Sequence, residues 1–220
     1  MLFISLVRLP GPGTVCFGET PGSQNEPEWG WSCSCTLTVA SGGPSLLVEL
    51  MGEQDPVSWM IRVEELRITS SEDGTERNWT GLEAFHHEGA DREGYLVFED
   101  MNFDGFMDLR LMKHPTAGPN TYWLFWLYST EERTLLQSLH YNDANLVSPV
   151  FDPETRRILS SHRDGMGMYG TETYEVVEDI PVMLEKKVIT FTDSTSSLVV
   201  IYKRVGDRMV EVERRLDPAE

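Results

Sequence analysis

Residues 121–128 read Thr121-Tyr-Trp-Leu-Phe-Trp-Leu-Tyr128, an almost unbroken run of apolar and aromatic side chains. A short run without alternation is typical of a strand covered on both faces, so the segment predicts a central strand. Polar residues follow at 129–133, and residues 134–139 return as a second, partly apolar segment. Strand, short polar turn and strand in this order predict an antiparallel β-hairpin.

Further strand-like segments lie on both sides of this hairpin. They cover residues 35–39, 45–50, 57–69, 95–98, 109–112, 148–151, 156–160, 171–177, 182–191, 197–204 and 209–215. Short strands at intervals of about ten residues are typical of antiparallel sandwiches and barrels. The segment 57–69 has a mixed period, which indicates a bulged strand or two strands, and residues 70–92 are polar and rich in turn formers. The sequence therefore predicts an all-β, antiparallel, hairpin-rich meander, either a sandwich or a barrel-like single domain.

The first 30 residues differ from the rest of the chain, because proline and glycine crowd positions 10–27. This composition predicts an irregular N-terminal arm or linker over 1–30, followed by a single β-domain over 31–216. The first nine residues are apolar but short, and Arg8 interrupts them. They resemble a weak or truncated secretion signal, or else an edge strand, so they provide no convincing signal peptide.

The three cysteines leave two interpretations open. Cys33 and Cys35 form a Cys-x-Cys spacing that matches neither a zinc knuckle nor a disulfide framework. A bridge from Cys16 to one of them is one alternative, and buried thiols are the other.

The charge balance restricts the class of partner. The chain of 220 residues has 36 acidic and 18 basic residues, a formal net charge of -18. Nucleic acid is excluded as an expected partner, because phosphate contacts require a local positive excess. A cation or a basic protein fits better, although the charge could also serve solubility alone. No apolar run reaches the length of about 18 residues that a membrane span needs.

The segment 100–108 reads Asp-Met-Asn-Phe-Asp-Gly-Phe-Met-Asp and predicts a Ca²⁺ site between two strands. Oxygen donors at positions 1, 3, 5, 7 and 9 of a calcium loop would come from Asp100, Asn102, Asp104, the Phe106 carbonyl and Asp108. Gly105 falls at position 6, where a sharp turn is needed, and Leu111 replaces the bidentate glutamate of an EF-hand. The alternative is a metal-free Asx turn, in which the same side chains accept hydrogen bonds from backbone amides.

A glycine-rich segment follows at 161–170, between two predicted strands. No helix follows the glycines, and the net charge repels anions, so phosphate binding is not expected. A tight projecting loop would present Met166, Met168 and Tyr169 to a partner protein. The alternative is a bulged hairpin turn with Tyr169 packed inward.

The order of motifs over residues 95–185 resembles a known bacterial family. It runs from the calcium loop through the aromatic strand and a Phe-Asp-Pro-x-Thr hairpin to Gly-x-Gly-x-Tyr-Gly-Thr-Glu-Thr-Tyr. This arrangement resembles the calcium-binding immunity proteins of type IV secretion effector–immunity pairs, which are similar in fold to periplasmic inhibitors of invertebrate-type lysozyme. The resemblance covers a little under half of the chain.

The resemblance implies an extracytoplasmic protein of the cell envelope that binds calcium and plugs the cleft of a lysozyme-like peptidoglycan hydrolase. It also implies a partner-binding loop that matches Ser161, Gly165, Gly167, Tyr169 and Gly170. No nucleophile motif appears, so the chain is not expected to be an enzyme. The alternative function is a structural or carbohydrate-binding calcium β-domain of the cell envelope without inhibitory activity.

Overall fold

The computed structural model describes residues 5–8, 15–19, 30–87, 95–115, 118–165, 167–192 and 195–218. Strand accounts for 68% of the structure and helix for 3%, so the all-β prediction is confirmed. The sheets are antiparallel, and they are not closed into a barrel. Contacts within the chain define two compact units, the first formed by Met1–Pro115 with Trp123–Ser138 and the second by Thr116–Tyr122 with Leu139–Glu220. The single domain over 31–216 stays a prediction.

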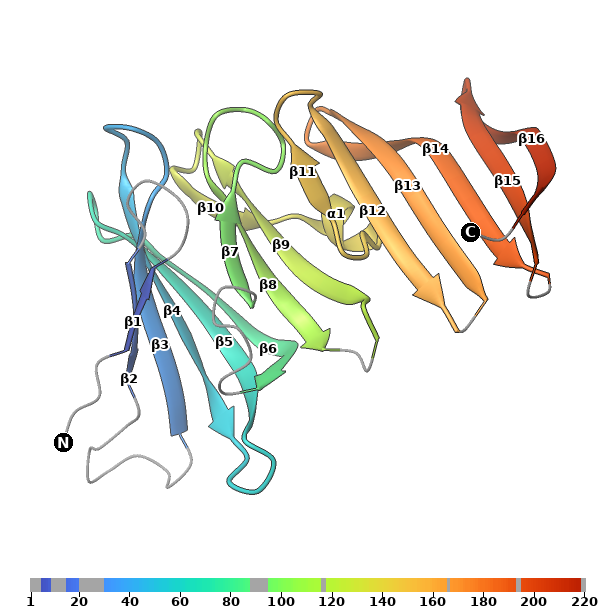
Figure 1. Ribbon diagram of the computed structural model, residues 1–220. Helices are drawn as coiled ribbons and strands as arrows, with labels where there is room; N and C mark the ends of the chain where they lie inside the picture. The colour runs from blue at the N-terminus through green and yellow to red at the C-terminus, as the bar shows by residue number, and fades with distance from the viewer. Residues whose placement is uncertain are drawn as a thin grey trace. The chain divides into compact units, whose positions relative to one another are not determined.

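The first unit contains a sheet with strand order β1-β2-β3-β4-β5-β6 (Figure 1). Its strands are β1 (Ser5–Arg8), β2 (Val15–Glu19), β3 (Gly30–Thr38), β4 (Ser45–Gln54), β5 (Met60–Ser70) and β6 (Glu76–His87). Two of them, β1 and β2, fall within the predicted irregular arm, which also includes Gly30 at the start of β3; its other residues lie outside the described parts. The backbone register pairs Cys16 with Cys35, and the side chains of Cys33 and Cys35 are buried.

A second sheet of the same unit has strand order β10-β9-β8-β7. Its strands are β7 (Leu96–Glu99), β8 (Asp108–Pro115), β9 (Thr121–Ser129) and β10 (Thr134–Gln137), and β9 begins before the unit boundary at Trp123. The pairing of Thr134 with Ser129 confirms the hairpin predicted from the aromatic segment. Trp126 is fully buried, as the absence of alternation in this segment indicated.

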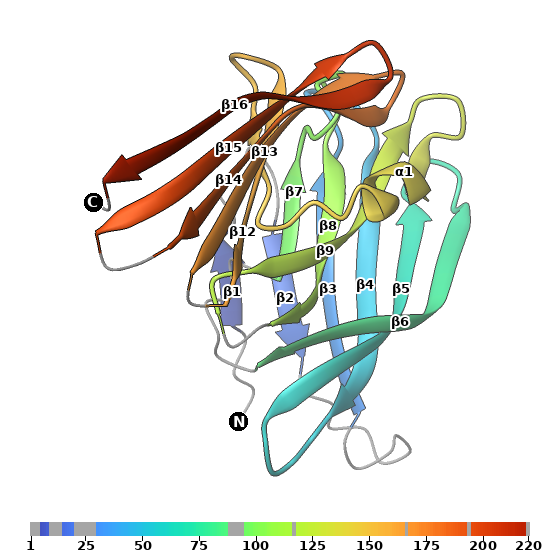
Figure 2. The same cartoon turned by 90° about the vertical axis from the view of Figure 1, so that its right-hand side faces the viewer.

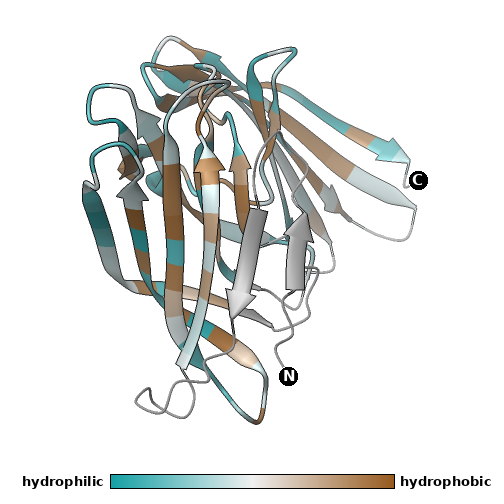
Figure 3. Cartoon of the chain, turned by 90° about the vertical axis from the view of Figure 1, so that its left-hand side faces the viewer, coloured by the Kyte–Doolittle hydropathy of each residue, from teal (hydrophilic) through white to brown (hydrophobic). Residues whose placement is uncertain are grey.

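One apolar core joins the two sheets of the first unit. Alternate residues of β4 enter it, because successive side chains of a strand point to opposite faces. Leu46, Val48 and Leu50 are completely buried, whereas Leu47 between them is 39% exposed. Trp126 of the second sheet joins the same cluster, where its ring meets that of Trp79 edge-on with centroids 6.0 Å apart. Figure 3 shows the resulting alternation of hydrophobic and hydrophilic positions along the strands.

The mixed period of 57–69 arises from a bulged strand. The register between β5 and β6 shifts between Val63 and Glu65, which moves the buried positions from one parity to the other. The segment 70–92, which is polar and rich in turn formers, nevertheless contains β6 over much of its length. Leu82 and Ala84 turn inward and Trp79 packs against the core, while the intervening residues of this edge strand are exposed.

The second unit contains a sheet with strand order β11-β12-β13-β14-β15-β16, in which neighbours follow the chain (Figure 2). Its strands are β11 (Val150–Asp152), β12 (Arg157–Asp164), β13 (Met168–Val177), β14 (Ile180–Phe191), β15 (Ser196–Val205) and β16 (Arg208–Pro218). This sheet confirms the meander predicted for the C-terminal part. A short helix, α1 (Leu139–Asp143), contacts β14. Within the described part of the chain, no helix has the length and apolar character that crossing a membrane requires.

Candidate calcium loop and β12–β13 hairpin

The predicted calcium loop joins β7 to β8 within the first unit. Met101 and Phe103 are buried, so the loop is fastened to the core by alternate apolar side chains. The Met107 N–H donates to the Val39 carbonyl at 2.8 Å, which fixes the end of the loop to the β3–β4 connection. Gly105 has φ +94°, a backbone conformation in which glycine avoids the Cβ clash. The sharp turn expected at position 6 is therefore present.

Asp108 connects this loop to the aromatic strand. Its carboxylate is completely buried and accepts hydrogen bonds from the backbone N–H groups of Met101 and Tyr128, both at 2.8 Å. Burial raises the pKa of Asp108 to about 8, the two amide donors oppose this shift, and the nearby carboxylates of Asp104 and Asp100 add to it. A positive charge in the loop would favour the ionised form.

The other polar side chains of the loop bond to its own backbone. The two carboxylate oxygens of Asp100 accept from the N–H groups of Asp104 and Gly105 at 3.0 and 2.9 Å. Asp104 accepts from the Phe106 N–H at 2.8 Å and from the Asn102 amide at 3.0 Å. The local arrangement thus has the hydrogen bonds of Asx turns.

The donor chemistry of the loop fits calcium, since every predicted ligand is a hard oxygen and each carboxylate oxygen has a further lone pair beside its amide bond. Among the described residues, no three acidic, histidine or cysteine side chains already converge as a metal-binding group. Binding would therefore require the Asp100 and Asp104 carboxylates to move closer to Asp108 and the ion. The calcium assignment stays a prediction.

An ion pair that the sequence pattern did not reveal lies at the base of the same hairpin. Arg110 of β8 contacts Glu99 of β7 at 2.7 Å, and its guanidinium lies 4.3 Å from the centre of the Trp123 ring. Burial raises the pKa of Glu99 and lowers that of Arg110, although each charge partly stabilises the other. Only the antiparallel register brings these side chains together.

The glycine-rich segment forms a tight turn between β12 and β13 in the second unit. Asp164 pairs with Met168 across the hairpin, so Gly165, with φ +60°, and Gly167 belong to the turn. Met168, at the start of β13, is 37% exposed. Met166 lies outside the described residues. The projecting part is therefore shorter than the predicted loop of 161–170.

Tyr169 lies on β13 and not at the tip of the turn. Its ring meets that of Phe191 edge-on with centroids 5.7 Å apart, and the Arg163 guanidinium lies 5.2 Å from its centre on the other side. The Phe191 N–H donates to the Gly167 carbonyl at 2.8 Å, which ties the turn to β14. Tyr169 is half-buried in this stack.

The remaining residues of the predicted binding loop are strand residues. Ser161 is an exposed residue of β12, and its N–H donates to the Val147 carbonyl at 2.9 Å. Gly170 is buried opposite His162, whose ring occupies the place where a Cβ would be, 2.1 Å from its nearest atom. This glycine therefore makes room for the cross-strand ring.

A buried charged group in β13 was also not anticipated. Glu172 accepts hydrogen bonds from the Tyr174 hydroxyl and the Lys186 ammonium, both at 2.8 Å. Burial raises the pKa of Tyr174, and the bond to the Glu172 carboxylate adds to this effect. The group ties β13 to β14, on the opposite face from Tyr169. Its members are three residues of ordinary type without a motif, so the sequence gives no signal for it.

The fold and the loop define an antiparallel all-β protein with an acidic oxygen-rich loop between paired strands. No family model matches the chain, and no curated protein sequence matches it. Among solved structures, it is similar to a chain described as "Structure of a Xanthomonas Type IV Secretion System related protein". The similarity has a TM-score of 0.51 at 16% sequence identity and covers 97% of this chain and 99% of that chain. At this identity the likeness establishes the fold alone.

Proposed function

We propose that this chain is a non-enzymatic, calcium-stabilised binding protein that inhibits a lysozyme-like peptidoglycan hydrolase outside the cytoplasm. The observation that carries the proposal is the Asp100–Asp108 loop, in which a fully buried carboxylate joins two strands. The similar Xanthomonas chain is described as related to a type IV secretion system, and that description agrees with an immunity role. The net charge of -18 favours encounter with a basic enzyme.

Calcium in this proposal has a structural role. Asp100, Asn102, Asp104, the Phe106 carbonyl and Asp108 would hold the ion, whose positive charge would offset the repulsion among the three carboxylates. Asp108 would then transmit the stability of the loop to the aromatic strand through the Tyr128 amide. The β12–β13 hairpin would supply the contact with the enzyme, because Met168 is partly exposed there and Tyr169 is held by its neighbours.

Calcium should stabilise the metal-stripped protein by about 2.7 kcal/mol when its free concentration is about 100 times the dissociation constant. Isothermal titration and thermal melting measure the binding and the stabilisation. Asp104→Asn should weaken binding while changing the metal-free stability little, since Asp104 is exposed and its loop bonds are local. A protein that neither binds calcium nor shifts its melting temperature would contradict the calcium role.

Inhibition is tested by following cell-wall lysis by a panel of lysozymes in the presence of about 1 μM protein. The protein should slow at least one enzyme, and Tyr169→Ala should weaken that inhibition by about 1 kcal/mol or more. Tyr202→Ala is the control, because Tyr202 is another half-buried tyrosine of the same sheet, placed two strands away on β15. Unchanged lysis across the panel, with calcium binding intact, would favour the calcium-stabilised envelope domain without inhibitory activity.

A further inference from the structure

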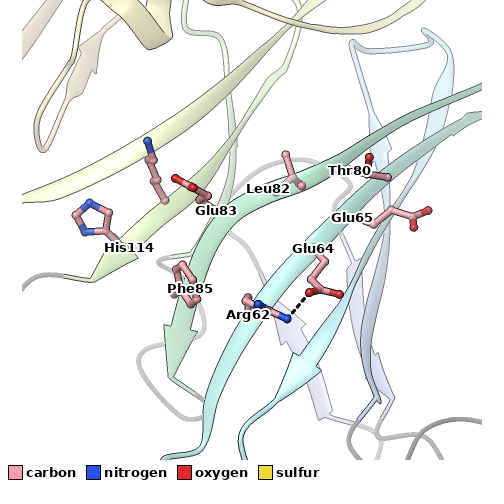
Figure 4. Close-up of a pocket in the computed structure, with 10 residues that line it drawn as sticks. Arg62, Glu64, Glu65, Thr80, Leu82, Glu83, Phe85 and His114 are labelled. Carbon is pink, nitrogen blue, oxygen red and sulfur yellow. Dashed lines mark ion pairs between the residues drawn. The ribbon is translucent and has the colours of Figure 1, made fainter.

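A second candidate surface lies in the first unit, on β5 and β6 and at the tip of the β4–β5 connection. Two adjoining hollows of about 670 and 530 Å³ share Arg62 and Phe85. The first, shown in Figure 4, extends over β6 to the end of β8, where Lys113 and His114 complete it. The second extends along β4 to the connection. Neither hollow uses a residue of the calcium loop or of the β12–β13 hairpin.

The tip of the β4–β5 connection presents two large apolar side chains to solvent. Val57 is 86% exposed and Trp59 is 59% exposed, and Trp59 lies between Ser58 and Met60, which line the second hollow. Large exposed apolar groups beside a hollow are typical of protein-contact sites, where tryptophan is a common anchor.

The backbone holds Trp59 in a fixed position. Asp55 accepts hydrogen bonds from the N–H groups of Val57 and Ser58 at 2.7 and 3.1 Å. The Trp59 N–H donates to the Asp55 carbonyl at 2.9 Å, and the Asp55 N–H donates to the Met60 carbonyl at 2.8 Å. These bonds keep Trp59 at φ +56°, a conformation that is rare for an aromatic residue. Because the backbone is already ordered, little main-chain entropy is lost when the tip binds.

The walls of the two hollows are predominantly negative. Their carboxylates belong to Glu53, Asp55, Glu64, Glu65 and Glu83, while the full positive charges belong to Arg62 and Lys113. Arg62 is paired with Glu53 at 3.1 Å and with Glu64 at 2.5 Å, and Glu65 is paired with Arg67 at 2.9 Å. Five carboxylates thus stand against the three cationic groups of Arg62, Arg67 and Lys113. Figure 4 shows Glu83 and Phe85 on β6, beside the Arg62–Glu64 ion pair of β5. The surface thus combines acidic walls with half-buried and exposed aromatic rings.

We propose that the two hollows with the Val57–Trp59 tip bind a basic, extended segment of a partner protein. Lysine or arginine side chains of such a segment would pair with the acidic walls and pack over the ring of Trp59, where the face of the indole attracts cations. Acidic segments would be repelled. The proposal does not depend on hydrolase inhibition, because the surface is built entirely from residues 53–85 and 113–114.

The test uses the full chain and a fluorescein-labelled octapeptide in which four arginines alternate with alanines, at about 150 mM salt. Fluorescence anisotropy should detect binding, and the same peptide with glutamate in place of arginine should not bind. Trp59→Gly should weaken binding by about tenfold or more. Its melting temperature should be unchanged or higher, because glycine adopts positive φ without strain. This variant therefore removes the anchor without threatening the fold.

A charge control separates a defined site from the general negative field. Glu64→Gln with Glu83→Gln should weaken binding by about tenfold, whereas Glu154→Gln with Glu178→Gln, which removes two exposed carboxylates from the second unit, should have little effect. Equal weakening by both pairs, no binding up to about 1 mM peptide, or binding unaffected by Trp59→Gly would each overturn the proposal. Sedimentation that reveals a dimer dissociated by Trp59→Gly would overturn it in favour of a second copy of the chain.

Discussion

Asp108→Ala should lower the free energy of unfolding by about 4 kcal/mol in calcium-containing buffer, and by roughly half of that in the presence of a calcium chelator. The larger loss has two sources. The amides of Met101 and Tyr128 lose their buried acceptor, at about 1–3 kcal/mol for each unsatisfied donor, and the proposed ion loses a ligand. Without calcium the loss is smaller, because the substitution also removes a buried carboxyl group whose ionisation burial opposes.

Urea unfolding of the wild-type protein and of Asp108→Ala, each with calcium and with chelator, gives four free energies of unfolding. Their differences give the coupling energy between Asp108 and the ion. Asp207→Ala is a suitable control, because the Asp207 side chain is fully exposed and its removal should change stability by less than about 0.5 kcal/mol. Asp108→Asn should give an intermediate loss, because asparagine has one acceptor oxygen whereas the two N–H donors bond to different oxygens of the carboxylate. Equal losses with and without calcium would mean that Asp108 stabilises the fold but does not contribute to a calcium site.

Gly52→Ala should lower the free energy of unfolding by about 3 kcal/mol. Gly52 lies at the register shift between β4 and β5, where a Cβ would stand 2.0 Å from the Arg62 carbonyl oxygen and 3.0 Å from the Val63 Cα. Both atoms belong to the backbone of the paired strand, so the clash can be relieved only by separating β4 from β5. Loss of the hydrogen bonds and core packing between these strands would follow.

Gly118→Ala provides the matched control, since Gly118 has nothing within 4 Å of an added Cβ and a φ outside the positive range. It should change stability by less than about 0.5 kcal/mol. Chemical denaturation compares the two variants, and circular dichroism verifies that the Gly52 variant retains its strands. A loss for Gly52→Ala no larger than that for Gly118→Ala would show that the bulge accommodates a side chain.

The positions of most strands could be predicted from sequence because they depend on local periodicity and turn chemistry. The aromatic segment gave a buried β9, and the C-terminal segments gave the meander from β11 to β16. β6 could not be predicted in this way, because most of its residues and the adjacent turn are polar. Its two buried positions, Leu82 and Ala84, are too few to define a period. The barrel-like alternative was wrong, because closure depends on how the edges meet and leaves no local pattern.

The β12–β13 hairpin depends on contacts that local sequence patterns do not reveal. Alternating glycines indicated a tight turn, and Gly165 does have positive φ. The position of Tyr169 depended on its neighbours in space, since Phe191 and Arg163 hold its ring beside the turn. The exposure of the Trp59 side chain could likewise not be predicted from the sequence, because a tryptophan in a strand-like segment is more often buried.

The sequence by itself determined the all-β class, the hairpins and the order of oxygen donors in the Asp100–Asp108 loop. These properties depend on residues within a few positions of one another, and their physical basis is side-chain alternation and turn geometry. The tertiary structure alone decided that Asp108 is buried against the Tyr128 amide, that Glu172 meets Lys186, and that Trp59 stands beside an acidic surface. Such contacts follow from the register between strands, which brings residues distant in sequence together, and burial then sets the electrostatic properties of each group.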